Sequence, residues 1–71
     1  MTRRFEFVGG NSAKFWEIEH RGPDVTVRFG RLGADGQVHT KNFPSRDAAD
    51  RHAQKLVAQK QAKGYVERTA A

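Results

Sequence analysis

The fold is decided by residues 16–29, which read WEIEHRGPDVTVRF. Apolar side chains occupy alternate positions on both sides of a short central turn, at Trp16, Ile18, Val25, Val27 and Phe29. Alternate side chains of an extended strand point to the same face, so this pattern predicts two strands that each bury one face. Gly22 and Pro23 supply the backbone freedom and the fixed φ that a tight turn uses. We therefore predict a β-hairpin.

A turn at residues 21–24 sets the register of this hairpin. The predicted cross-strand pairs are His20 with Val25, Ile18 with Val27, Trp16 with Phe29, and Lys14 with Arg31. This register keeps the apolar side chains on one face, as burial requires. It also places Lys14 and Arg31 at the end of the sheet that holds two glycine-containing loops, residues 9–12 and 33–36.

The flanking sequence predicts two more strands and one helix. Alternation around residues 5–7 and over residues 37–43 is typical of strands, while over residues 45–63 the apolar spacing changes to three or four, which is typical of a helix. The expected buried stripe of this helix is Ala49, His52, Ala53, Leu56, Val57 and Lys60. Ser45 is the expected N-cap, and Gly64 stands where a glycine commonly ends a helix.

These elements predict an α+β fold, a twisted antiparallel sheet of four to five strands with one helix packed on one face. Residues 65–66 would supply the fifth strand. No repeat or linker divides the chain, so we expect one domain over residues 1–71, with an ordered core at about residues 3–67 and a frayed tail at residues 69–71.

The size and composition of the chain limit the classes of function that it can have. The chain has 71 residues and no cysteine, so neither a disulfide nor a thiolate-bound metal can reinforce its core. A domain of this size buries only about 60% of its unfolded surface, which leaves little room for an enclosed enzyme cleft. We expect no enzyme, no cofactor and no metal site, because His20, His39 and His52 also lack ligand spacing.

Charge points to an anionic partner. Thirteen Lys and Arg against eight Asp and Glu give a formal net charge of +5, which attracts any polyanion without selecting among them. The apolar runs are too short to span a membrane. Residues 1–6 contain no hydrophobic stretch, so we expect no secretory signal and a soluble, cytoplasmic monomer.

The sheet end that carries Lys14 and Arg31 is the candidate binding site. Two cations, two glycine loops and the rings of Trp16 and Phe29 converge there, which suits a phosphate beside a flat sugar or base. Equally, both rings could belong to the core and both cations could be solvated. Helix residues Arg51, Lys55 and Lys63 form a supporting basic face, although such a face is also common on solvated helices.

An ordered set of residues resembles the WGR domain over nearly the whole chain. The set is Phe29-Gly30-Arg31, Gly33, Gly36-Gln37, Lys41, Phe43, Ala49, Lys60 and Gly64-Tyr65. WGR domains stand beside the catalytic region of DNA-dependent poly(ADP-ribose) polymerases and also occur as small free-standing bacterial domains. In the polymerases the domain contacts DNA near a break, with its tryptophan stacked on a sugar.

The resemblance implies a small stand-alone member with Phe29 at the stacking position, Gly30 allowing close approach and Arg31 at the arginine position. Phenylalanine keeps the stacking face but lacks the indole N–H. The expected function is a non-catalytic module that binds DNA backbone, ends or nicks with low sequence specificity, through Lys14, Phe29, Gly30, Arg31 and Lys41. The alternative is a protein-interaction domain in which Arg31 and the loops dock an acidic partner.

Two further constellations have structural explanations. Glu17 and Glu19 share a strand face and could form an acid/base pair, but ion pairing with Arg28 and Arg4 is the simpler expectation. These acids also repel phosphate, so DNA should avoid the middle of that face. No histidine base accompanies Ser12 or Ser45 in any recognisable pattern.

Overall fold

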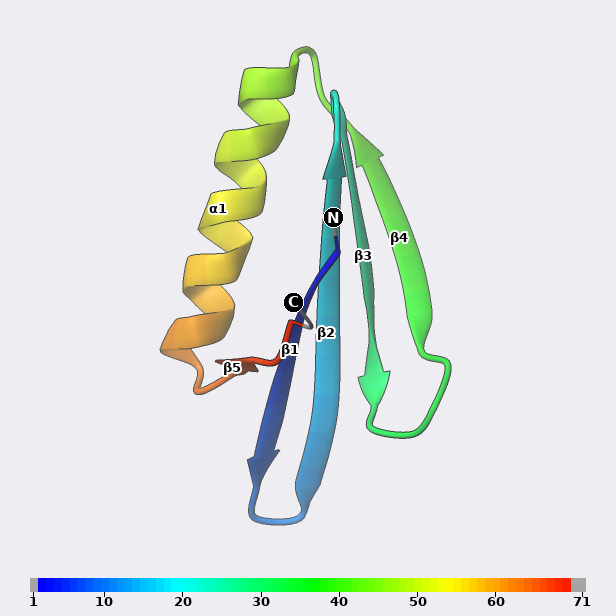
Figure 1. The fold of residues 1–71 in the computed structure, drawn as a ribbon, viewed down its shortest axis with the longest axis vertical. Coiled ribbons are helices and arrows are strands. Elements are labelled where there is room, and N and C mark those ends of the chain that lie inside the picture. The colour runs from blue at the N-terminus through cyan, green and yellow to red at the C-terminus, as the bar shows by residue number, and fades with distance from the viewer. Residues whose placement is uncertain (1, 70–71) are drawn as a thin grey trace.

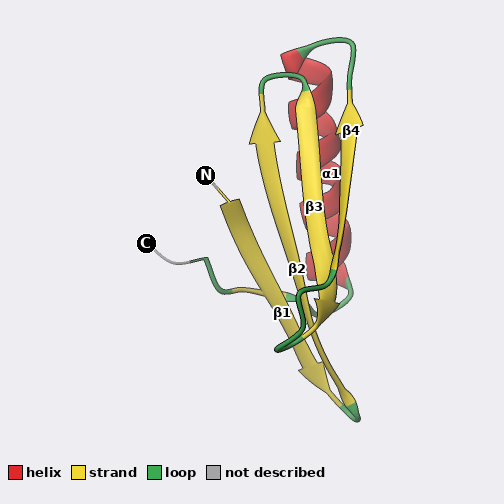
Figure 2. Ribbon diagram, turned by 90° about the vertical axis from the view of Figure 1, so that its right-hand side faces the viewer, coloured by secondary structure: helices red, strands yellow, loops and turns green. Residues whose placement is uncertain are grey.

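The computed structural model describes residues 2–69. Its elements are β1 (Thr2–Gly9), β2 (Ser12–Arg21), β3 (Asp24–Arg31), β4 (Gln37–Asn42), α1 (Arg46–Ala62) and β5 (Val66–Glu67). The strands form one antiparallel sheet in the order β4-β3-β2-β1-β5, and α1 lies along one face of it (Figures 1 and 2). The predicted α+β architecture is confirmed, with the fifth strand starting one residue later than expected.

The predicted register of the β2–β3 hairpin is confirmed. Trp16 pairs with Phe29, and Lys14 pairs with Arg31. The turn that sets this register contains Gly22 at a φ of 54°, a left-handed conformation that glycine adopts without strain. Because side chains alternate along each strand, Lys14 and Arg31 point to the same face as Trp16, the face that α1 covers.

The core lies between this face and the helix. Its buried members are Phe5, Trp16, Ile18, Val25, Ala49, Ala53 and Val57. The rings of Phe5 and Trp16 are tilted, with centroids 5.6 Å apart. The small side chains of Ala49 and Ala53 let the helix approach these rings closely, so the stripe predicted from helical spacing is the packing surface.

Both ends of α1 are capped as the sequence predicts. The Ser45 hydroxyl accepts a hydrogen bond from the backbone N–H of Ala48 at 3.1 Å. At the other end, Gly64 has a φ of 99°, and the N–H of Tyr65 donates to the carbonyl of Lys60 at 3.0 Å. This Schellman arrangement satisfies the last carbonyls and turns the chain toward β5.

The opposite face of the sheet, which we call the open face, carries no helix but buries one aromatic ring. Phe15 is 2% exposed. The guanidinium carbons of Arg4 and Arg28 lie over its ring, 4.7 and 5.2 Å from the centroid. Glu17 accepts from Arg4 at 2.7 Å and from Arg28 at 2.9 Å, which confirms the predicted ion pairing of Glu17.

The C-terminal segment is fastened to β1. Arg3 donates to both carboxylate oxygens of Glu67 at 2.8 Å. Thr69, predicted to lie in a frayed tail, instead accepts a hydrogen bond from the Arg4 backbone N–H at 3.0 Å. This bond places Thr69 beside the edge of β1. Residues 70–71 of that predicted tail lie outside the described residues.

Candidate nucleic-acid interface

The predicted site lies at the lower end of the molecule in Figure 1, where β2 begins and β3 ends. Lys14 and Arg31 both line one hollow of about 420 Å³, together with the backbone of the β1–β2 turn around Asn11 and Ser12. The Leu32 N–H donates to the carbonyl of Ala13 at 3.0 Å, which ties the two loops together. The structure therefore brings Lys14 and Arg31 to one surface.

Phe29 lies on the same face and is partly open to solvent. Its side of the sheet is the helix side, but the residue remains 36% exposed while its partner Trp16 is buried. The ring stacks on His39 of β4, with centroids 5.6 Å apart and planes 12° apart. Phe29 is thus neither sealed in the core nor free-standing, and it presents a flat apolar edge beside Arg31.

Three lysines form a cluster that the sequence did not reveal as a unit. Lys14, Lys60 and Lys63 line a second hollow of about 290 Å³ with Phe7 and Tyr65. The ammonium nitrogen of Lys60 lies 5.2 Å from the Tyr65 ring centroid, and that of Lys14 lies 5.9 Å from the Phe7 ring centroid. No carboxylate is among the residues that line this hollow. We call these three residues the lysine cluster.

Lys60 is the most buried charge of the lysine cluster, and it lies close to the other two. Burial lowers the pKa of the Lys60 ammonium below its ordinary value, and the charges of Lys63 and Lys14 lower it further. Like charges without an opposing carboxylate are a standing cost to the folded state, and a bound anion would relieve it. Sequence reasoning placed Lys60 on the buried stripe, and a lysine in the last turn of such a stripe was the available signal.

The other predicted basic residues lie elsewhere. Lys41 pairs with Val25, six residues along β3 from Arg31, which corresponds to about 20 Å at the rise of a strand. Its ammonium nitrogen lies 5.3 Å from the ring centroid of Phe43. Arg51 and Lys55 are exposed on α1 and line neither hollow. Only Lys63 of the supporting helix face joins the lysine cluster.

Gly30 has a packing role inside the domain. A Cβ atom at this position would meet the Cα of Gly36 at 2.9 Å and the Phe15 ring at 3.6 Å. The β3–β4 loop therefore folds back over the open face and covers Phe15. Close approach of a ligand at Gly30 remains a prediction, whereas close approach of the loop is observed.

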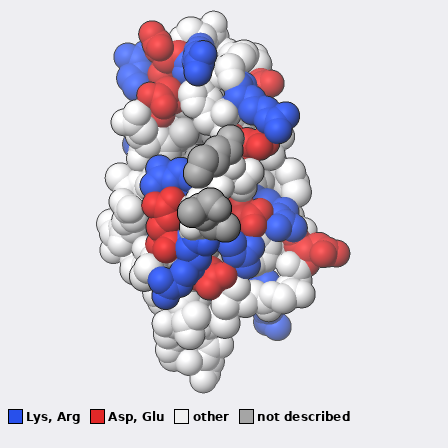
Figure 3. Space-filling model, viewed as in Figure 1, with Lys and Arg blue, Asp and Glu red and all other residues white. Residues whose placement is uncertain are grey.

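Charge is unevenly distributed around the site. Figure 3 shows basic and acidic side chains interleaved near β1 and β5 and neither kind at the lowest end of this view. Residues 7–13, which form the β1–β2 hairpin end, contain no charged residue. The cations therefore surround the base of this hairpin, while its end is neutral.

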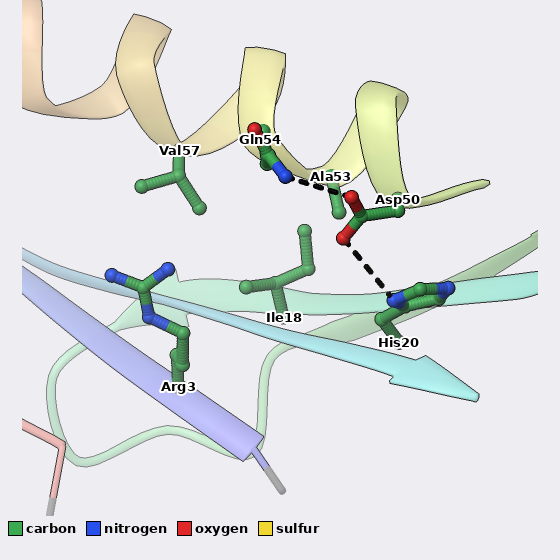
Figure 4. A pocket seen from close by; sticks show the side chains of 7 residues that line it. All are labelled: Arg3, Ile18, His20, Asp50, Ala53, Gln54 and Val57. Carbon is green, nitrogen blue, oxygen red and sulfur yellow. Dashed lines mark hydrogen bonds and ion pairs between the residues drawn. The ribbon is translucent and has the colours of Figure 1, made fainter. Parts of the chain in front are cut away.

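A smaller pocket on the helix face has different chemistry. Figure 4 shows Asp50 and Gln54 of α1 above His20, Ile18 and Arg3. The Gln54 amide donates to Asp50 at 2.7 Å, and His20 Nδ1 lies 3.8 Å from an Asp50 oxygen. Within residues 2–69 no group of three His, Cys, Asp or Glu is arranged to hold a metal ion. The polar side chains of this pocket interact mainly with one another, through Asp50.

The fold and this site define a small α+β domain with a basic surface at one end of its sheet. The chain belongs to the WGR domain family, because the family model matches residues 1–71. WGR domains are a nucleic-acid-binding type of domain. No helix in the described part of the chain is long and apolar enough to cross a membrane.

Similar proteins are longer than this chain. The Escherichia coli proteins YfeS and YehF are each 37% identical to it, over 94% and 92% of this chain but only 28% and 24% of their own lengths. A crystal structure of a Bacteroides fragilis protein superposes with a TM-score of 0.95 at 51% identity. That match covers 97% of this chain and 20% of the other. The chain thus spans between 20% and 28% of the length of these relatives.

Proposed function

We propose that this domain binds DNA without catalysis, through backbone phosphates at an end or nick and with low sequence specificity. The observation that carries the proposal is the gathering of four cations, Lys14, Arg31, Lys60 and Lys63, around two adjoining hollows that share Lys14. No carboxylate lines either hollow. Phosphate oxygens are the natural counter-charges for such a set.

The chemistry of the site favours backbone contacts over base reading. Lysine ammonium groups are compact point charges that contact phosphates without selecting a base edge. Phe29 adds a flat apolar surface next to Arg31, which suits a sugar or terminal base. The Glu17 carboxylate on the open face supports this placement, since it would repel a DNA strand laid across that face.

Fluorescence anisotropy with a labelled blunt duplex tests the proposal. We expect binding that weakens steeply between about 50 and 200 mM salt, because bound phosphates release counterions. The variants Lys14→Gln, Lys60→Gln and Arg31→Gln should each weaken binding and lower the salt slope by about one. A duplex closed by hairpins at both ends should bind less tightly than an open one.

Lys55→Gln is the matched control, because it removes the same charge from an exposed helix position outside both hollows. It should change affinity by no more than about twofold. Absence of binding at low salt, or equal losses for Lys55→Gln and Lys60→Gln, would refute the proposed site. Salt-tolerant capture of an acidic protein through Arg31 without DNA binding would favour the protein-interaction alternative.

A further inference from the structure

A groove separates α1 from β4 on the helix face. Its lining includes Val25, Val27, His39, Lys41, His52 and Leu56, and it encloses about 200 Å³. The helix packs over β2 and β3, and β4 is the outer strand of the sheet on this side. The floor of the groove is therefore apolar, whereas Lys41 and two histidines stand at its sides. This groove lies at the opposite end of β3 from the lysine cluster.

The outer edge of β4 is free to pair with another strand. Within the described chain β4 is hydrogen-bonded only to β3, and all six of its residues are exposed. The Phe43 N–H donates across to the Pro23 carbonyl of the β3 side at 2.8 Å. The backbone groups of Phe43 therefore point inward, toward β3. Because these groups alternate in direction along an antiparallel strand, those of Val38, Thr40 and Asn42 point outward.

The side of α1 that faces this edge is basic. The α1 residues that line the groove are His52 and Leu56. At 100° per residue, Lys55 and Gln59 follow His52 along the same flank of the helix. The helix acids Asp47 and Asp50 fall on the other side, and Figure 4 shows Asp50 directed toward His20 of β2. The groove and its helical wall are thus free of carboxylates.

The two faces of β4 differ in character. On the helix face its side chains are Gln37, His39 and Lys41, so this face is polar and carries one positive charge, at Lys41. On the open face they are Val38 and Thr40, and Val38 is 60% exposed. A strand added to this edge would meet Lys41 and polar side chains on one face and apolar surface on the other.

We propose that the β4 edge binds an extended peptide segment in which acidic and apolar side chains alternate. The segment pairs with the outward backbone groups of Val38 and Thr40, places its carboxylates toward Lys41 and Lys55, and packs its apolar side chains beside Val38. This interaction surface is separate from the proposed DNA site. Its test contains no nucleic acid, so either proposal can fail without the other.

An NMR titration with a capped peptide of alternating glutamate and valine tests the proposal. We expect amide shifts confined to residues 37–42 and to the adjoining face of α1, and binding that weakens as salt rises. Val38→Pro removes an outward N–H without breaking a bond to β3 and should weaken binding by about fivefold or more. Val38→Thr keeps that N–H and should bind within about twofold of the parent domain.

A second set of measurements tests whether peptide binding depends on the charges of Lys41 and Lys55. Lys41→Gln and Lys55→Gln together should lower affinity by about fivefold, and a peptide of alternating lysine and valine should not bind. Unchanged dispersion of the helix signals shows that each variant is folded. Equal binding of the two peptides, or equal behaviour of Val38→Pro and Val38→Thr, would overturn the proposal.

Discussion

Gly30 and Gly36 lie in backbone contact, so close that a Cβ on Gly30 would stand 2.9 Å from the Cα of Gly36. Gly36 adopts a φ of 78°, and a side chain there would collide with the carbonyl of Phe29. Through this contact the β3–β4 loop covers Phe15 and positions the first residue of β4 next to β3. The WGR-like triplet is therefore anchored by the packing of its own loop.

Replacing Gly30 by alanine should lower the free energy of unfolding by about 1–3 kcal/mol, because the new methyl group must displace the Gly36 backbone. Urea denaturation of the two proteins measures the change. Gly9→Ala is the control, since its methyl group would meet only the edge of the Phe7 ring at 3.3 Å. Equal losses for the two variants would show that the Gly30–Gly36 contact is not tight.

Lys60→Met should stabilise the domain by about 0.5 kcal/mol while weakening DNA binding. The change removes a partly buried charge whose pKa is lowered by burial and by Lys63 and Lys14, and like-charge repulsion of this kind is worth a few tenths of a kcal/mol. Methionine retains contact with Trp16 and Tyr65. Thermal unfolding and anisotropy measure the two effects.

Lys55→Met, at an exposed position, is the control for Lys60→Met. It should change neither the stability of the domain nor its affinity for DNA appreciably. If Lys60→Met destabilised the domain, the cation–π contacts of Lys60 would outweigh the repulsion. The lysine cluster would then serve to stabilise the fold.

Glu17→Gln should lower the free energy of unfolding by about 1–2 kcal/mol at neutral pH, because Arg4 and Arg28 both donate to this largely buried carboxylate. Hydrogen bonds from Arg28 and Arg4 lower the pKa of Glu17 below 4.5. The carboxylate thus stabilises the fold above pH 4.5, and that contribution is lost as the pH falls through the lowered pKa.

Denaturation at a series of pH values should therefore show the parent and Glu17→Gln curves converging in acid. Glu19→Gln is the control: its ion-pair partner Arg21 is mostly exposed, and the change should cost no more than about 0.5 kcal/mol. Parallel curves over the whole pH range would contradict the assigned role of Glu17.

The carboxylate of Glu67 should titrate with a pKa of about 2. Hydrogen bonds from Arg3 and then Thr69 hold its pKa below the ordinary 4.5. The attachment of β5 should be complete above pH 4.5 and weaken as the pH falls toward 2, because protonation removes the acceptor. Side-chain carboxyl NMR gives the midpoint, and hydrogen exchange of the Arg68 N–H, which donates to the Arg4 carbonyl, reports the attachment.

Arg3→Met should raise the Glu67 midpoint toward 4.5, whereas Arg21→Met, which disturbs a separate exposed pair, should leave it unchanged. A midpoint near 4.5 in the parent protein would mean that the bidentate pair does not persist in solution.

The site was only partly predictable from the sequence. The opposition of Lys14 and Arg31 followed from the turn and the two-residue period of the strands. The burial of Phe15 could not be predicted, because alternation along the strand places this residue on the polar face. It is buried there by the β3–β4 loop and by the side chains of Arg4 and Arg28. Phe29 has the alternation of a core residue yet stays exposed, since α1 does not extend over that end of β3.

By itself the sequence determined the approximate positions of the strands, the register of the β2–β3 hairpin, both ends of the helix and the excess of positive charge, because each depends on spacing or on turn and capping residues a few positions apart. Only the tertiary structure decided that Lys60 and Lys63 meet Lys14 and that the flank of α1 beside β4 is free of acids. Those relationships depend on where the helix lies over the sheet, and that position is set by the joint packing of Ala49, Ala53 and Val57 against the strands.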